Sequence, residues 1–297
     1  MTLSRNSLEP SEKVSEDNPL KTGTGVNCES ANGKISEQVG MGNVLRCGKL
    51  HLWSVPEGCL FTPRADSMVH VVTVNAEIFA LAHEDRRFAE ILAKTVNTID
   101  GRVLQGICKL LYPNHKIVRQ NGSGFVFDLA EHCRTHSENL FLLGSSEKAN
   151  ALAIQRLQGE FPGLQISGYS PALRNYPFDR EWNVRILEQI ERFKPNHLVV
   201  CFGPKKQEYW IHENSSHLTA LGVRCAYGLG GTIDFVSGVK PRAPKWIEFI
   251  GAEWLFRLAC EPRARFRRTL VMFKMPIYAV KTARNIGPLS SPFAGVR

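Results

Sequence analysis

Several polar residues and glycines directly follow short apolar runs, at positions where strands are expected to end. Thr73 and Asn75 lie in VVTVNAE, Asp100 precedes Gly101 in NTIDGRV, and Gln207 lies in CFGPKKQEYW. The carboxyl ends of parallel strands meet at one edge of a sheet, and ligands bind there. The carboxylate, amides and hydroxyl of this set suit proton transfer and hydrogen bonds to a polar substrate. Further members of the set are Arg119, Gly228, Gly230, Gly231 and Asp234.

The common phosphate-binding motifs are absent from the sequence. Gly33-Lys34 is followed by Ile35, so the P-loop pattern fails, and Ile233 occupies the third glycine position of GxGxxG. No DxD pair is available to hold a metal-bound nucleotide diphosphate, and no zinc-binding spacing occurs. We therefore predict no metal and no cofactor. A diphosphate would have to be neutralised by Arg, Lys, backbone N–H groups and helix N-termini.

The positive charge is concentrated at one end of the chain. The net charge is +9 at pH 7, and residues 240–297, with 12 Lys or Arg and three acidic residues, account for all of it. This segment also contains WIEFIGAEWLF, followed by phenylalanines interleaved with arginines. Helices that combine aromatic and basic residues in this way lie on anionic lipid surfaces. Residues 246–297 are therefore predicted to form a membrane-associating appendage. Two ordinary helices packed on the body are the alternative.

The rest of the sequence indicates a tail followed by one α/β domain. Residues 1–43 are rich in Ser, Glu, Asn and Gly, which predicts a disordered tail. Across residues 44–245, short apolar runs alternate with helix-like stretches, which predicts a Rossmann-like parallel sheet with helices on both faces. The expected strands include 70–74, 141–144, 164–169, 197–203 and 223–231. The expected helices include 77–95, 146–161, 179–193 and 207–218.

The composition also bears on cellular location. No run approaches 18 apolar residues, and the N-terminus lacks the basic start and apolar block of a signal peptide. The chain is therefore expected to stay in the cytoplasm. The eight cysteines form no CxxC pair, and we interpret them as reduced thiols that lie mostly in the core.

Taken together and in this order, these segments resemble the WecB/TagA/CpsF family of bacterial glycosyltransferases, glycosyltransferase family 26, over about residues 45–272. The most specific stretch is GLGGTIDFVSGVKPRAPKWIEFIGAEWLFRLACEPRARFRR, which resembles the signatures GxGGxxDFxxG, RAPxW and GxEWxxRLxxEPxR. TVNAE, FLLG, FPGLQISGY and FGPKKQEYW match further blocks. The resemblance implies a Rossmann-like domain whose C-terminal appendage completes the active site at the membrane.

The same resemblance implies an activity. It is inverting transfer of a sugar from a UDP-sugar to a saccharide on a polyprenyl-pyrophosphate lipid, without an obligatory metal, in exopolysaccharide or cell-surface polysaccharide synthesis. The implied location is peripheral, on the cytoplasmic face of the bacterial inner membrane, with an anionic membrane surface as a further partner. Nucleic acid is not expected, because no recognised nucleic-acid module occurs. The sequence leaves open whether the chain forms a homo-oligomer.

The resemblance assigns roles to the residues at the strand ends. Asp100 falls on the family's DG aspartate, the general base that takes the proton of the acceptor hydroxyl as it attacks the anomeric carbon. Thr73 and Asn75 fall on the polar pair beside that pocket. Arg119 and Gln207 fall on further pocket positions, for the sugar or the diphosphate.

Other roles concern the nucleotide. The glycines of Gly228–Gly231 would let the backbone approach it, and Arg257 and Arg267 would neutralise charge on the leaving diphosphate. Asp234 is included among the binding residues. The alternative roles are a turn or helix cap for Asn75, a helix cap for Asp234 and a surface position for Arg257.

The chain departs from the family pattern around the sugar pocket. Ile99 and Val103 stand where family members usually have a proline before the DG aspartate and a second glycine after it. Gly124 replaces an aspartate, Pro204 is displaced, and Ala264 stands at an arginine position. These departures predict a donor or acceptor other than the N-acetylmannosamine and N-acetylglucosamine pair. The alternative is a non-catalytic member that binds a nucleotide-sugar or scaffolds polysaccharide assembly.

Overall fold

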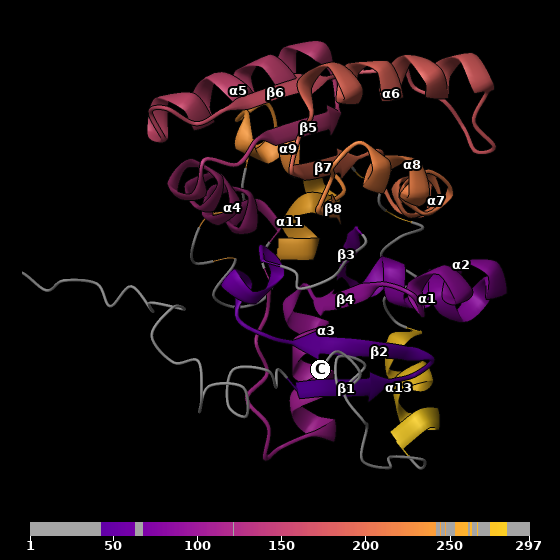
Figure 1. Ribbon diagram of the computed structural model, residues 1–297. Helices are drawn as coiled ribbons and strands as arrows, with labels where there is room; N and C mark the ends of the chain where they lie inside the picture. Colours follow the sequence, from indigo (N-terminus) through magenta and orange to yellow (C-terminus); the bar gives the residue numbers. More distant parts are fainter. Residues whose placement is uncertain are drawn as a thin grey trace, which may run out of the picture. The chain divides into compact units, whose positions relative to one another are not determined.

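An eight-stranded sheet forms the centre of the structure, with strand order β1-β2-β4-β3-β8-β7-β5-β6 (Figure 1). The computed structural model describes residues 43–62, 68–120, 122–241, 244, 247, 253–260, 262, 266 and 274–283. All neighbouring strands are parallel except β1 and β2, which form an antiparallel hairpin at one edge. The strands are β1 (Asn43–Cys47), β2 (Leu50–Ser54), β3 (Val69–Val74), β4 (Val96–Ile99), β5 (Leu140–Gly144), β6 (Ile166–Tyr169), β7 (His197–Cys201) and β8 (Cys225–Gly228).

Helices cover both faces of this sheet, as the sequence predicts. One face packs against α4, α5 and α9, and the other against α6, α7 and α8 over one half and α1, α2, α3 and α13 over the other. The helices are α1 (Ala76–Glu84), α2 (Arg86–Leu92), α3 (Arg102–Leu111), α4 (Gly122–His136), α5 (Glu147–Glu160), α6 (Arg180–Phe193), α7 (Lys206–Glu213), α8 (Ser215–Ala220), α9 (Thr232–Val236), α11 (Glu253–Cys260) and α13 (Met275–Ala283), with a 3-10 turn η1 (Glu57–Leu60).

The central strands are continuous apolar runs because both of their faces are buried. In β5, Leu140 and Leu142 pack in the cluster of α4 and α5, whereas Phe141 and Leu143 pack in the cluster of α6 and α7. All five residues of β5 are buried. The α/β class predicted from the sequence is thereby confirmed.

Two predicted helices are each divided in two. In the 77–95 stretch, α1 ends before Asp85, which has an extended backbone and whose carboxylate accepts a hydrogen bond from the Phe88 N–H at 3.1 Å, so that a second helix begins. In the 207–218 stretch the break falls at Asn214. The prediction of single helices is therefore wrong in both stretches. At the first break the capping side chain of Asp85 starts a new helix. At the second, Asn214 makes no side-chain cap, and its Nδ2 donates back to the Trp210 carbonyl at 2.8 Å.

The strand β4 is not visible as an apolar run. Its sequence is VNTI, and Asn97 and Thr98 are both buried. Asn97 Nδ2 donates to the Leu92 carbonyl at 2.7 Å, and the Thr98 hydroxyl donates to the Val72 carbonyl at 3.4 Å. Polar groups whose hydrogen bonds are satisfied in this way can lie inside a sheet. Hydropathy alone therefore does not predict β4.

The helix α13 belongs to the body of the protein. Met275 and Ala279 are buried in the core cluster that contains β1 and α1. Lys274 Nζ lies 2.8 Å from Glu84 Oε1, and the Tyr278 ring stacks on His83 with centroids 4.7 Å apart. The last described helix of the chain therefore contributes to the core.

Two predictions about the chain's ends lie largely outside the described residues. They are the disordered tail over 1–43, of which only Asn43 is described, at the start of β1, and most of the appendage over 246–297. No helix in the part of the chain that the structure describes is long and apolar enough to span a bilayer. Of the cysteines described, Cys59 and Cys260 are exposed. The buried ones, as predicted for most of the thiols, are Cys47, Cys108, Cys133, Cys201 and Cys225.

Candidate active site at the carboxyl edge of the sheet

Asn75 and Asp100 lie side by side at the carboxyl ends of two neighbouring strands. Val74 pairs with Ile99 in the β3–β4 ladder, and the Asp100 N–H donates to the Val74 carbonyl at 2.8 Å. Both side chains are half-buried. A carboxylate and a carboxamide therefore leave the sheet together at the edge where ligands bind in parallel α/β proteins.

Asn75 is the N-cap of α1. Its Oδ1 accepts hydrogen bonds from the N–H groups of Glu77 and Ile78 at 3.0 and 3.1 Å, so the alternative role as a helix cap is confirmed. The cap uses only the oxygen of the carboxamide, and the NH2 group can still donate two hydrogen bonds. Capping thus holds the side chain in one orientation without consuming its donors.

Arg119 is brought to the same edge by the backbone. The N–H of the next residue, Gln120, donates to the Ile99 carbonyl at 2.8 Å, and Gln120 Nε2 donates to the Val55 carbonyl at 2.7 Å. These two bonds fix the chain that carries Arg119 beside the end of β4. The half-buried arginine therefore lies near the end of β4, after which Asp100 follows.

Thr73 and Gly228 join β3 to β8 at this edge. The Thr73 hydroxyl, 5% exposed, donates to the Gly228 carbonyl at 3.4 Å. A Cβ atom on Gly228 would lie 3.0 Å from Gln207 Nε2 and 3.2 Å from Glu208 Oε1. Glycine is needed here because the first turn of α7 packs directly on the end of β8.

Gln207 positions the glycine-rich turn after β8. Its Oε1 accepts a hydrogen bond from the Gly230 N–H at 3.0 Å, while its Nε2 donates to Glu208 Oε1 at 2.8 Å. Gly230 has a φ of +61°, a conformation that glycine adopts without strain. Because Gln207 is 1% exposed, its amide holds the glycine-rich turn in place and is not presented to solvent.

Glu208 is buried, although a Gln-Glu pair that opens a helix predicts a solvated side chain. Its side chain is fully buried, and Oε2 has no hydrogen-bond partner among the described residues. Burial raises the pKa of Glu208 from 4.5 to about 7, and this outweighs the hydrogen bond from Gln207. A Gln-Glu pair that opens a helix is usually solvated, but the YWI that follows is buried and could have indicated otherwise.

Asp234 does not act as a helix cap. The N-cap of α9 is Gly231, and the Asp234 carboxylate accepts the hydrogen bond of the Ser145 hydroxyl and lies 3.0 Å from Lys240 Nζ. It connects the end of β5 to α9 and to the loop that follows. Its role in substrate binding stays a prediction. The same holds for the side chain of Arg257 and for Arg267, which lie outside the described residues.

The fold defines an α/β protein with a mostly parallel sheet, and residues at the strand ends and a glycine-rich turn form its candidate ligand site. A family model described as the Glycosyl transferase WecG/TagA/CpsF family matches residues 59–289. The chain belongs to this family, which confirms the resemblance, and it is a glycosyltransferase.

Curated relatives cover most of the same region. A Bacillus subtilis protein is 29% identical over 215 residues, which are 72% of this chain and 80% of the relative. One from Bacillus spizizenii is 30% identical over 72% of this chain and 79% of its own length. One from Staphylococcus aureus is 25% identical over 75% and 83%. All three are named N-acetylglucosaminyldiphosphoundecaprenol N-acetyl-beta-D-mannosaminyltransferase.

Proposed function

We propose that the protein transfers one sugar from a UDP-sugar to a saccharide carried on a polyprenyl-diphosphate lipid, in bacterial exopolysaccharide or cell-surface polysaccharide synthesis. The observation that carries this proposal is the pairing of Val74 with Ile99, which places Asp100 beside Asn75 at the carboxyl edge of the sheet in a chain of this family. The names of the relatives support the lipid-linked acceptor.

Asp100 is the proposed general base. The acceptor hydroxyl must lose its proton as it attacks the anomeric carbon, and a carboxylate within hydrogen-bond reach can take it. Attack on the side opposite the departing UDP inverts the anomeric configuration. Asn75 and Arg119, which lie near the ends of β3 and β4, are suited to hold sugar hydroxyls or the diphosphate.

The donor diphosphate can be bound without a carboxylate platform. The N-cap position of α3, Gly101, makes no side-chain capping hydrogen bond, so the first N–H groups of this helix suit an anion. Val103 lies in the first turn of α3, close to Asp100, and we propose that it helps to select a donor or acceptor different from those in the names of the relatives. Ile99 is fully buried in the core, so its side chain does not reach the substrate.

Release of UDP by the purified protein tests the transferase and its dependence on metal. With a panel of UDP-sugars in the presence of EDTA, we expect release from one donor that requires a lipid extract containing the acceptor. Loss of that release in EDTA, regained with Mg²⁺, would contradict metal-independent transfer. UDP binding without release from any donor would favour the non-catalytic binding protein.

Membrane attachment is proposed to use exposed apolar side chains of the C-terminal segment. Leu255 in α11 is 51% exposed and Phe266 is 59% exposed, within the segment that carries the positive charge. We propose that they enter the acyl boundary of an anionic membrane, on the cytoplasmic face. Deleting residues 246–297 would test this poorly, because Met275 and Ala279 are buried in the core.

Point substitutions test the attachment without removing the core residues. Leu255→Gln combined with Phe266→Gln should weaken co-sedimentation with anionic vesicles at least about tenfold, since each buried apolar side chain contributes about 1.5–3 kcal/mol. Leu173→Gln, at an 89% exposed position before α6, is the matched control and should bind as the wild type does. Equal binding of all three proteins would exclude these side chains from the membrane contact.

A further inference from the structure

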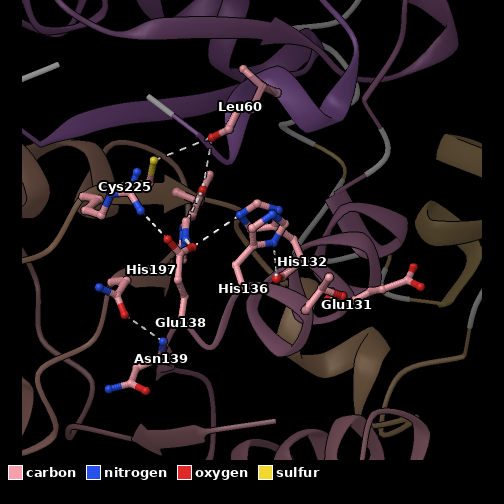
Figure 2. A network of polar contacts seen from close by, with 12 residues as sticks. Leu60, Glu131, His132, His136, Glu138, Asn139, His197 and Cys225 are labelled. Atoms are coloured by element: carbon pink, nitrogen blue, oxygen red, sulfur yellow. Dashed lines mark hydrogen bonds and ion pairs between the residues drawn. The ribbon is translucent and has the colours of Figure 1, made fainter. Parts of the chain in front are cut away.

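A second polar cluster lies at the opposite, amino-terminal edge of the sheet (Figure 2). His197 is the first residue of β7, His132 lies in the last turns of α4, and Glu138 lies in the connection from α4 to β5. Figure 2 draws these three side chains, with dashed lines for their contacts. None of these residues belongs to the candidate active site.

The ligand atoms of the three side chains converge. Glu138 Oε2 lies 2.6 Å from His197 Nε2 and 3.3 Å from His132 Nε2, and all three atoms lie within 4.8 Å of one another. The side chains are 0%, 11% and 13% exposed for His197, His132 and Glu138. Bonds of 2.0–2.2 Å to one ion place its ligand atoms about 3.3 Å apart in a tetrahedral site. The 3.3 Å contact of His132 matches this spacing, and the 2.6 Å contact of His197 would have to open by a few tenths of an ångström to admit an ion.

Within the part of the chain that the structure describes, the hydrogen bonds of this cluster leave one buried ring nitrogen without a partner. A proton between His197 Nε2 and Glu138 Oε2 would complete that contact. It would leave His132 Nε2, which is buried and has no hydrogen-bond partner among the described residues. An ion that bonds to all three atoms satisfies them together.

The surroundings favour His197 Nε2 as a lone-pair donor. His197 Nδ1 lies 2.9 Å from the Tyr227 hydroxyl oxygen, and that hydroxyl donates to the Leu60 carbonyl at 3.2 Å. In the tautomer that carries its proton on Nδ1, Nδ1–H donates to the Tyr227 hydroxyl oxygen and Nε2 keeps its lone pair for an ion. Such an outer hydrogen bond is typical of histidines that bind metal.

The carboxylate can serve two cations. The Arg224 guanidinium donates to Oε1 of Glu138, which leaves Oε2 facing the histidines. Metal-binding carboxylates usually carry an outer hydrogen bond of this kind. Two imidazoles and one carboxylate suit Zn²⁺ or Co²⁺, with a water at the fourth position.

We propose that His132, Glu138 and His197 bind one divalent transition-metal ion of the Zn²⁺ class. The ion would tie the end of α4 to the start of β7 and, through Arg224, to the start of β8. Because it lies at the edge opposite Asp100, its role is to stabilise the fold rather than to take part in sugar transfer.

Titration with Co²⁺ tests the proposal, because tetrahedral Co²⁺ has a visible absorption that reports its ligands. On the full chain without a histidine tag, we expect one equivalent of Co²⁺ to bind and to give that absorption. Zn²⁺ should displace the bound Co²⁺ and should raise the midpoint of thermal unfolding. Loss of an outer-shell partner lowers the affinity for a metal by about 10- to 100-fold. Because His132 is a proposed ligand, His132→Ala should lower the affinity for Co²⁺ by more than that. The matched control is His136→Ala, since His136 stacks on His132 with centroids 4.0 Å apart but is not a ligand.

Two results would overturn the metal site. One is wild-type protein that binds no stoichiometric Co²⁺ or Zn²⁺ and whose thermal midpoint does not respond to them. The other is a folded His132→Ala variant that binds Co²⁺ as tightly as the wild type. Since the first result concerns only the wild-type chain, the test does not depend on the folding of any variant.

Discussion

Replacing Asp100 by asparagine should lower turnover by about 100- to 10,000-fold, the usual contribution of a general base. The amide is nearly isosteric, and the Asp100 N–H bond to the Val74 carbonyl belongs to the backbone, so the strand ends should stay in place. UDP binding, measured by calorimetry, should be retained, because the base acts on the acceptor hydroxyl and not on the donor. Turnover is measured as lipid-dependent UDP release.

The control for this substitution is Asp128→Asn, which removes the same charge from an exposed position on α4. It should have wild-type turnover. Near-normal turnover of Asp100→Asn would remove the assignment of the base. Joint loss of turnover and UDP binding would instead place Asp100 in the donor site.

Replacing Glu208 by glutamine should remove the contribution of this carboxyl group to the pH dependence of the free energy of unfolding. Burial raises the pKa of Glu208 from 4.5 to about 7, so between these values the unfolded chain releases a proton that the folded chain keeps. The contribution of Glu208 to the free energy of unfolding therefore falls as the pH rises from about 4.5 to about 7. At about 1.4 kcal/mol per pKa unit, the total loss is about 3 kcal/mol. Glutamine stays neutral and can still accept from Gln207.

Denaturant unfolding from pH 4.5 to 8 measures this effect. The wild type should lose about 3 kcal/mol relative to Glu208→Gln across that range. Glu181→Gln, at a side chain 85% exposed, should follow the wild type. Parallel pH profiles for the wild type and Glu208→Gln would show that the buried carboxyl does not hold its proton in the folded protein.

The fold was predictable to the extent that hydropathy reports burial. The runs that became β3, β5 and β7 are apolar because both faces of each strand are covered, and this made the parallel sheet visible in the sequence. The hairpin of β1 and β2 and the polar strand β4 were not visible. Their burial depends on partners elsewhere in the chain, such as the Leu92 carbonyl that accepts from Asn97.

For the candidate site, the sequence indicated the residues but not what holds them. Thr73 and Asn75 were found at the end of an apolar run and Asp100 in an Asp-Gly pair that matches the family, and strand order then places them at one edge. The buried Gln207–Glu208 pair follows from the packing of α7 on Gly228, which no spacing rule expresses. His132, Glu138 and His197 were missed for the same reason, since 59 residues separate the two ends of the Glu138–His197 contact.

The product formed on the lipid tests the central claim most directly. The purified protein, a UDP-sugar donor and a polyprenyl-diphosphate saccharide should yield an acceptor whose mass has grown by one sugar. NMR of that product should show an anomeric configuration opposite to that in the donor, with Asp100→Asn forming little of it. Retained configuration, or UDP release at the same rate with no sugar added to the lipid, would contradict the account.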